Sequence, residues 1–196
     1  FELYSWETYK AVNQKFADAI LEKANNEDTI WIHDYQLMLV PQMVRAERPD
    51  ISIGFFLHIP FPSYEIFRTL PWRREVLQGL LGSDLIGFHT YDYERHFLSS
   101  VRRLLGLEVS FNDIYLDDRV IKVDSFPMGI DYKKFSDAAK EHSQRTEDQK
   151  SELQKRLDTH KKSAPDAKFF LSIDRLDYTK GIAKRLNAFE YFLKKY

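Results

Sequence analysis

The sequence predicts an α/β protein built on a parallel β-sheet with helices on both faces. Short apolar segments of strand length recur along the chain, and segments with helical periodicity separate them. This alternation is typical of parallel sheets, whose strands are joined by crossover helices and buried on both faces. Several apolar segments also end in titratable side chains, and ligands of open parallel sheets bind at such strand ends.

The N-terminal part of the chain contains two predicted helices and two predicted strands. Residues 7–24 are predicted to be helical because apolar side chains recur on one helical face: Tyr9, Val12, Phe16, Ala19, Ile20 and Ala24. Residues 29–32 and 51–57 are apolar runs of strand length. Residues 35–47 are predicted to be helical, although Pro41 is unfavourable near the first turns.

The middle of the chain repeats the pattern. A helix is predicted between Pro71, at a favoured first position, and Gly82, a stop signal. Residues 85–88 form a third strand and residues 120–126 a fourth, and a helix marked by Phe97, Val101 and Leu104 lies between them.

The C-terminal part contains two predicted helices and one predicted strand. Residues 137–162 form a charged helical stretch, and residues 169–173 form a further strand. A last helix is predicted from apolar side chains at helical spacing: Ile182, Leu186, Phe189 and Leu193.

The composition excludes several classes of protein. The 196-residue chain has a formal net charge of −1, so nothing indicates a nucleic-acid or membrane-surface partner. It contains no cysteine, which excludes a disulfide scaffold and fits a cytoplasmic protein. No apolar run approaches the roughly 20 residues that span a bilayer. The chain opens at Phe1 and its last helical pattern still runs at Tyr196, so we expect a fragment of a larger enzyme.

Titratable side chains follow four of the predicted strands: His33 and Asp34, then His58, then His89, then Asp174 and Arg175. Because parallel strands end at one edge of a sheet, clustering at these positions predicts a ligand site. The segment 55–62 reads FFLHIPFP, so His58 is followed by a loop that two prolines stiffen. A stiff loop holds a side chain in place for binding, and a structural histidine under a proline-rich turn is the alternative.

Five segments carry a resemblance to a known family. They read WIHDYQLMLVPQMVR, FFLHIPFPSYEIFRTLPWR, DLIGFHTYDYERHF, SFPMGID and DRLDYTKGI. In this order and spacing they resemble the trehalose-6-phosphate synthase family over nearly the whole chain. The resemblance implies a GT-B fold, with two Rossmann-like domains facing a cleft. It also implies retaining transfer of glucose from UDP-glucose to glucose 6-phosphate, which makes trehalose 6-phosphate.

The resemblance assigns site residues in the first domain. It implies that Asp34 binds the acceptor sugar, with Tyr35 lining the same pocket. It implies that His58 contacts the donor glucose and that Ile59 shapes the wall that selects the anomer. Capping of helix 35–47 is the alternative role for Asp34, since aspartate is a favoured N-cap, and a core aromatic is the alternative for Tyr35.

Arg175 and Lys180 are the implied donor-side cations. They flank a predicted strand-to-helix turn, where amide donors and two cations suit a diphosphate. Two solvated surface cations are the alternative. Asp174 and Asp177 are expected to orient this loop or pair with Arg175 rather than bind metal, and no metal or cofactor is expected.

The resemblance also predicts domain limits and partners. Residues 1–127 are expected to be the later part of the acceptor domain, and residues 128–196 the start of the nucleotide-sugar domain. The expected partners are UDP-glucose and glucose 6-phosphate, with an oligomer or a fused phosphatase domain as further possibilities for the full-length protein. A synthase for another phosphorylated acceptor or donor, such as glucosylglycerol-phosphate synthase, and a non-catalytic sugar-phosphate sensor remain alternatives.

Overall fold

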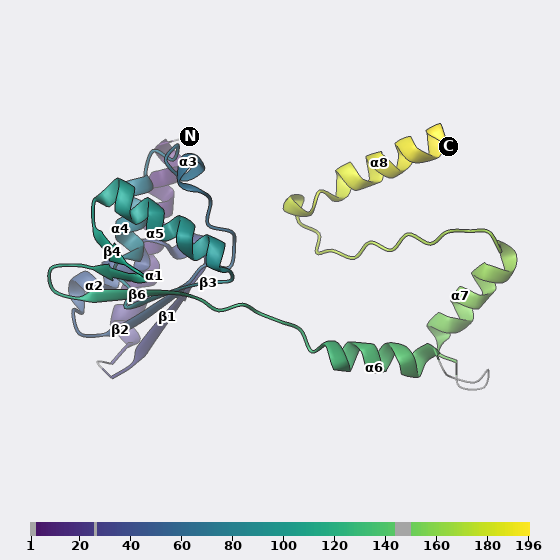
Figure 1. Ribbon diagram of the computed structural model, residues 1–196, viewed down its shortest axis with the longest axis horizontal. Coiled ribbons are helices and arrows are strands. Elements are labelled where there is room, and N and C mark those ends of the chain that lie inside the picture. Colours follow the sequence, from purple (N-terminus) through teal and green to yellow (C-terminus); the bar gives the residue numbers. More distant parts are fainter. Residues whose placement is uncertain (1–2, 26, 144–149) are drawn as a thin grey trace. The chain divides into compact units, whose positions relative to one another are not determined.

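A computed structural model describes residues 3–25, 27–143 and 150–196, and the chain divides into two compact units (Figure 1). The first unit is Phe1–Ile130 and the second is Asp131–Tyr196. The roles predicted for residues 1–127 and 128–196 as acceptor and nucleotide-sugar domains stay predictions.

The first unit contains a six-stranded sheet in the order β1-β2-β3-β6-β5-β4. The pairs β1–β2, β2–β3 and β3–β6 are parallel. The pairs β6–β5 and β5–β4 are antiparallel. The bounds are β1 Thr29–His33, β2 Ser52–Phe56, β3 Leu85–Phe88, β4 Glu108–Ser110, β5 Asp113–Tyr115 and β6 Val120–Ser125. The strands predicted at residues 29–32, 51–57, 85–88 and 120–126 are confirmed, whereas the short β4–β5 hairpin was not predicted.

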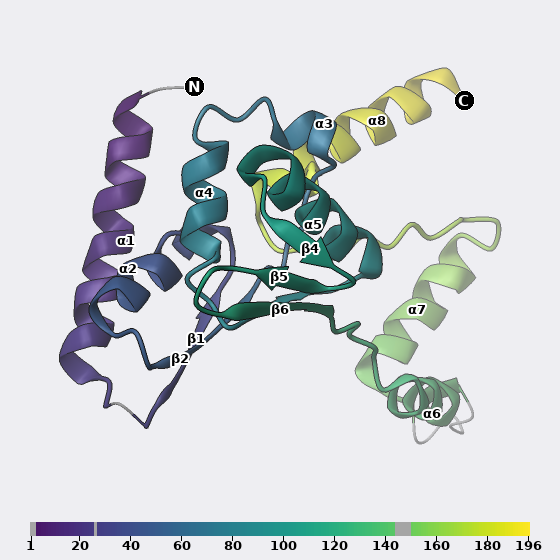
Figure 2. The same ribbon diagram turned by 60° about the vertical axis from the view of Figure 1, so that its left-hand side comes forward.

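The helices of the first unit cover one face of this sheet (Figure 2). They are α1 Leu3–Lys23, η1 Tyr35–Leu37, α2 Val40–Glu47, α3 Tyr64–Phe67, α4 Arg73–Leu80 and α5 Tyr91–Leu105. The crossovers from β1 to β2, from β2 to β3 and from β3 to β6 all step in the same direction across the sheet. Right-handed connections therefore place α2, α4 and α5 on the same side.

The two faces of the sheet differ sharply in burial. One row across the strands, from Ile32 through Phe55 and Ile86 to Val123, is at most 3% exposed. In the row next to it, which faces the other way, Trp31 is 66% exposed and Leu85 is 39% exposed. The prediction of helices on both faces is therefore fulfilled on one face only within the described residues.

Pro41 explains why the helix predicted over residues 35–47 is divided. Residues 35–47 form the 3-10 helix η1 and then α2, in which Pro41 lies in the first turn. Proline lacks an N–H and is tolerated where a helix begins, since that N–H would have no partner inside the helix. The predicted single helix is therefore wrong in its continuity but correct in its end at Glu47.

The second unit consists of helices joined by extended segments. Its elements are α6 Tyr132–Ser143, α7 Glu152–Ser163, the 3-10 helix η3 Tyr178–Lys180 and α8 Ile182–Lys195. The helix predicted over residues 137–162 is divided between α6 and α7, and residues 144–149 of that prediction lie outside the described residues. The helix predicted from Ile182 onward is confirmed as α8.

The strand predicted at residues 169–173 is wrong. This segment is extended but pairs with no strand in the described part of the chain, and Leu171 is 86% exposed. A β-strand requires a neighbour that satisfies its backbone groups, and apolar character alone does not supply one. The prediction included parallel sheets in both domains. The described residues contain one sheet, which lies in the first unit.

Candidate functional site

Three histidines meet at the carboxyl edge of the parallel strands. His33 ends β1, His58 follows β2 and His89 follows β3. The Nδ1 atom of His33 lies 3.0 Å from Nε2 of His58, and the rings of His58 and His89 lie 5.4 Å apart between centroids. The gathering of strand-end side chains predicted for this unit is therefore present. We call these three residues the histidine cluster.

The Phe56 ring packs against two members of the histidine cluster, His58 and His89. Its ring centroid lies 4.7 Å from that of His58 and 4.9 Å from that of His89. Phe56 is only 8% exposed although it lies on the open face of the sheet. A Cβ atom on Gly87 would lie 2.6 Å from the Phe56 ring, so glycine on β3 is what allows the ring to lie across the strand.

The loop after β2 is anchored at both ends and exposed between them. Leu57 and Phe61 are each 1% exposed, whereas Ile59 is 41% exposed and His58 is also exposed. Phe61 packs against the rings of Phe67 and Phe97 at 4.8 and 5.3 Å. The loop thus presents His58 and Ile59 to solvent from a fixed base, as the prolines suggested.

Asp34 adopts a strained backbone conformation. Its φ of 69° and ψ of 171° lie in a region that glycine mainly occupies. The backbone N–H donates to the Phe56 carbonyl at 2.8 Å, and Oδ1 accepts from the Tyr35 N–H at 3.0 Å. The side chain therefore caps η1 rather than the long helix predicted over residues 35–47. Strain of this kind costs about 1–3 kcal/mol and is concentrated at functional sites.

Two polar residues of α1 support the turn after Asp34. The Tyr9 hydroxyl donates to the Tyr35 carbonyl at 2.7 Å and accepts from the Met38 N–H at 3.0 Å. Asn13, which is fully buried, accepts from the Leu39 N–H at 3.0 Å. Burial raises the pKa of the Tyr9 hydroxyl. The sequence pattern placed Tyr9 on the apolar face but did not reveal this support.

An apolar groove of about 560 Å³ runs along the open face beside the histidine cluster. Its lining includes Trp31, His33, Phe56, His58, Phe126 and Met128. This volume is in the range of small-molecule sites. Asp34, Tyr35 and Ile59 do not line the groove. The Tyr35 side chain is 48% exposed, but it lies outside the groove lining.

Arg175 and Lys180 lie in the second unit. Both side chains are exposed, and Lys180 ends η3 immediately before Gly181 and α8. Asp177 caps η3 by accepting from the N–H and hydroxyl of Thr179 at 2.9 and 2.8 Å. These hydrogen bonds lower the pKa of Asp177. The helix start predicted after Lys180 is present, because α8 begins at Ile182. Asp177 orients the turn before it through its hydrogen bonds to Thr179.

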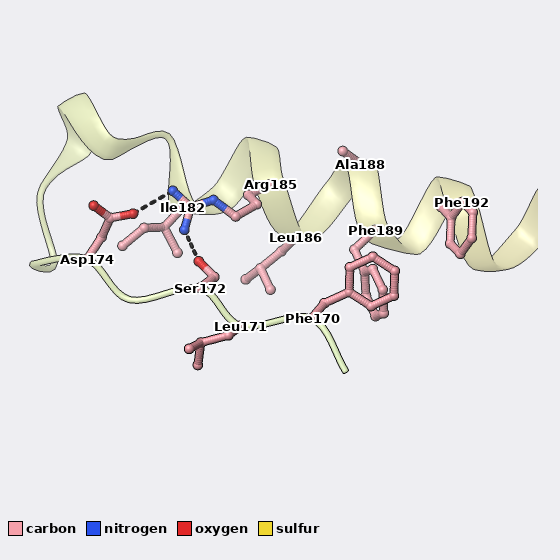
Figure 3. A pocket seen from close by; sticks show the side chains of 10 residues that line it. All are labelled: Phe170, Leu171, Ser172, Asp174, Ile182, Arg185, Leu186, Ala188, Phe189 and Phe192. Carbon is pink, nitrogen blue, oxygen red and sulfur yellow. Dashed lines mark hydrogen bonds and ion pairs between the residues drawn. The ribbon is translucent and has the colours of Figure 1, made fainter. Parts of the chain in front are cut away.

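Arg185 connects the two ends of this loop (Figure 3). Its Nη2 atom lies 2.6 Å from Asp174 Oδ2 and donates to the Lys180 carbonyl at 3.1 Å, while Nη1 contacts the Ser172 hydroxyl. Of the two roles expected for Asp174, orienting the loop or pairing with Arg175, the structure supports the first, because Asp174 pairs with Arg185. Arg185 was not identified from the sequence, since helical spacing marked only its apolar neighbours.

A second apolar cavity, of about 620 Å³, lies between residues 170–174 and α8. Figure 3 shows Phe170 beside Phe189 on this surface. Neither Arg175 nor Lys180 lines it. We therefore do not assign this cavity to the predicted diphosphate site.

Among the described residues, no group of three or more histidine, aspartate or glutamate side chains is arranged to hold a metal ion. No helix in the described ranges is long and apolar enough to cross a membrane.

These features define a Rossmann-like α/β protein with a candidate ligand site at the carboxyl ends of its parallel strands. The model for glycosyltransferase family 20 matches residues 1–196. The chain belongs to this family. The predicted α/β class of the GT-B type is confirmed.

Curated relatives match the whole chain but are much longer. The UDP-forming α,α-trehalose-phosphate synthase of Schizosaccharomyces pombe is 46% identical over 200 residues, covering 100% of this chain and 37% of the relative. The synthase of Emericella nidulans is 47% identical and covers 98% of this chain and 37% of the relative. Across eight such relatives, the chain spans between 25% and 41% of their length.

Solved structures also match nearly the whole chain and are much longer than it. A trehalose-phosphate synthase of Burkholderia xenovorans in complex with glucose-6-phosphate is 30% identical, with a TM-score of 0.76 over 99% of this chain and 42% of that chain. An E. coli structure bound with UDP-2-fluoro glucose is 32% identical, with a TM-score of 0.76 over 100% and 42%. The N-terminal domain of a Candida albicans trehalose-6-phosphate phosphatase is 39% identical, with a TM-score of 0.74 over 97% and 39%.

Proposed function

We propose that residues 1–196 are part of a retaining glucosyltransferase that makes trehalose 6-phosphate from UDP-glucose and glucose 6-phosphate. The match of the whole chain to synthases at about 46% identity carries this proposal. The bound glucose-6-phosphate and UDP-2-fluoro glucose of the related structures support the two substrates. The arrangement of strand-end residues in the first unit is consistent with a sugar-binding edge.

In the first unit we assign acceptor and donor contacts to different strand ends. Asp34 binds acceptor hydroxyls with the charge-assisted hydrogen bonds that a carboxylate accepts, and Tyr35 lines the same pocket. His58 contacts the donor glucose, and Ile59 shapes the wall that selects the anomer. The strain at Asp34 and the two-sided anchoring of the His58 loop support these assignments.

In the second unit, Arg175 and Lys180 bind the donor diphosphate. Their charge stabilises the UDP that departs as the sugar–phosphate bond breaks. The leaving phosphate assists deprotonation of the acceptor on the same face of the sugar, so no carboxylate nucleophile is required. No metal or cofactor enters this proposal.

The complete protein is proposed to be longer than 196 residues and cytoplasmic. The coverage of the curated relatives supports the greater length. The Saccharomyces cerevisiae relative is named a 56 kDa subunit, which supports an oligomer. A fused phosphatase domain is supported by the similarity to the Candida albicans phosphatase domain.

That similarity also favours a second candidate function. The chain would then belong to a phosphatase-type protein, in which this fold is a non-catalytic sugar-phosphate sensor. Product analysis of the full-length protein distinguishes the two. With UDP-glucose and glucose 6-phosphate, the first function predicts trehalose 6-phosphate and UDP. Binding of glucose 6-phosphate without product favours the sensor, and product only with glycerol 3-phosphate or another nucleotide donor favours a related synthase.

The isolated 196-residue chain is expected not to turn over UDP-glucose. Related synthases are more than twice as long, so much of the proposed two-domain cleft lies outside these residues. UDP release by the purified chain, followed with a coupled assay, is the measurement. Release above a protein-free blank would contradict this expectation.

Replacing Asp34 with alanine in the full-length enzyme is expected to weaken acceptor binding more than donor binding. The loss of a hydrogen bond to a charged group costs about 1.5–3 kcal/mol, which is about tenfold to a hundredfold in acceptor KM. Steady-state kinetics with each substrate varied gives the two values.

Asp34→Asn separates sugar binding from capping. Asparagine retains an acceptor for the Tyr35 N–H and caps well, but it lacks the carboxylate charge. If sugar binding is the role of Asp34, both variants raise the acceptor KM. A normal acceptor KM in Asp34→Asn would leave capping as its role.

A further inference from the structure

The contact between His33 and His58 restricts the chemistry of both rings. The 3.0 Å separation of His33 Nδ1 and His58 Nε2 is a hydrogen-bond distance. One of these nitrogens donates a proton and the other accepts it, so the tautomers of the two rings are coupled: either both rings carry the proton on Nδ1 or both carry it on Nε2. Each ring nitrogen has a single in-plane hydrogen-bonding position. The Nε2 atom of His58 is therefore occupied by His33.

Neighbouring rings hold this pair in position. Trp31 stacks on His33 with ring centroids 5.5 Å apart and planes 11° apart. On the other side, His58 contacts Phe56 at 4.7 Å and meets His89 edge to face at 5.4 Å. No hydrogen bond joins His89 to His58 among the residues that the structure describes. His33 is thus the polar partner that orients the His58 ring.

We propose that His33 is a positioning residue that occupies Nε2 of His58 and leaves Nδ1 of His58 as the nitrogen that meets the substrate. This inference rests on the proposed role of His58 at the donor glucose. A histidine without such a partner can turn its ring and present either nitrogen to the substrate. His33 holds the ring with Nε2 inside the pair and Nδ1 outside it before substrate binds, which is the effect expected of preorganisation.

The first experiment compares three replacements of His33 in the full-length enzyme. Asparagine places an amide close to the position of the imidazole Nδ1, glutamine reaches the more distant Nε2 position, and alanine supplies no partner. We expect His33→Ala to lower kcat about tenfold, in line with one lost hydrogen bond between neutral groups. Both KM values should stay within about twofold, because the orienting effect is felt in the reaction.

Conservative rescue separates positioning from packing. We expect His33→Asn to recover most of the kcat lost in His33→Ala, and His33→Gln to recover less. His160→Asn is the matched control, because His160 is an exposed histidine of α7. A kcat of His33→Ala within about twofold of wild type would overturn the proposal. Equal losses in His33→Ala and His33→Asn would also overturn it.

A second pair of variants tests which nitrogen of His58 meets the substrate. His58→Asn retains a polar atom near Nδ1, whereas His58→Gln retains one near Nε2. The proposal expects higher kcat in His58→Asn than in His58→Gln. The reverse order would contradict the assignment of Nδ1.

The third measurement does not depend on turnover. Long-range ¹H–¹⁵N correlation spectra of histidine-labelled protein report the protonation and hydrogen bonding of each ring nitrogen. We expect His58 Nε2 to show the signal of a nitrogen hydrogen-bonded to the protein in wild type and in His33→Asn, and to lose it in His33→Ala. If wild-type protein transfers no glucose, the proposed function fails while the spectra still decide whether His33 occupies Nε2 of His58. An identical His58 signal in wild type and His33→Ala would refute that role.

Discussion

Replacing Arg175 with alanine in the full-length enzyme is expected to lower kcat about 10²–10³-fold, which is the typical effect of removing one preorganised donor from a developing charge. Negative charge grows on the diphosphate as the sugar–phosphate bond breaks. A cation that meets this charge stabilises the transition state more than the bound substrate. The acceptor KM should therefore change much less than kcat.

The structure gives the physical basis for this expectation. Arg175 and Lys180 flank a turn that Asp177 caps and that Arg185 ties to Asp174 and to the Lys180 carbonyl. Both cations remain exposed in the second unit. Their loop is thus supported by neighbouring groups while their charges stay available for a ligand.

Three further variants make the test specific. Arg175→Lys should recover little if the guanidinium binds phosphate oxygens in a bidentate manner. Arg175→Ala combined with Lys180→Ala should be non-additive, because both side chains act on one ligand. Lys184→Ala, which removes an exposed cation from the first turn of α8, is the matched control. Near-normal kcat in both single variants would return Arg175 and Lys180 to the class of surface cations.

The strand-end site of the first unit could be predicted because its determinants are local and topological. Apolar runs of strand length identified β1, β2 and β3, and parallel strands bring their carboxyl ends to one edge. His33, His58 and His89 therefore meet as the pattern indicated. Their hydrogen-bonded pairing could not be predicted, because it depends on ring orientations that packing against Trp31 and Phe56 determines.

Other features depend on long-range contacts that the pattern does not contain. The open face of the sheet follows from crossovers that all step in one direction, and the apolar pattern does not specify this strand order. The segment 169–173 has strand composition but no partner in the described residues, so composition alone misled. The strain at Asp34 arises where β1 passes into η1, and its φ above zero contradicts the usual preference of a non-glycine residue.

Gly82 shows the same distinction between a correct boundary and its physical cause. The sequence identified it as a helix stop, and α4 does end just before it, at Leu80. Its φ, however, is not positive, so a left-handed cap is not the reason for glycine here. A Cβ atom at this position would lie 2.2 Å from the Gln42 backbone nitrogen and 2.3 Å from the Pro41 carbonyl carbon. Glycine is needed because the chain after α4 touches the backbone of α2.

Replacing Gly82 with alanine is therefore expected to destabilise the first unit by about 3 kcal/mol, the upper part of the range for overpacked cores. The obstructing atoms belong to the backbone of α2 and cannot move aside as a flexible side chain would. Arg45 adds to the constraint, because its Nε donates to the Gly82 carbonyl at 3.0 Å and its Nη2 pairs with Asp84 at 2.7 Å. Relief of the clash would have to displace this network.

Urea unfolding of the 196-residue chain, followed by tryptophan fluorescence, measures this effect. Trp6, Trp31 and Trp72 all lie in the first unit, so the signal reports its unfolding. Gly54→Ala is the matched control, since a Cβ atom on Gly54 in β2 meets nothing within 4 Å. Alanine should be neutral or stabilising there by up to about 1 kcal/mol, because glycine is unfavourable inside a strand. Equal stability of the two variants would show that α2 and the turn after α4 do not touch as closely as the structure places them.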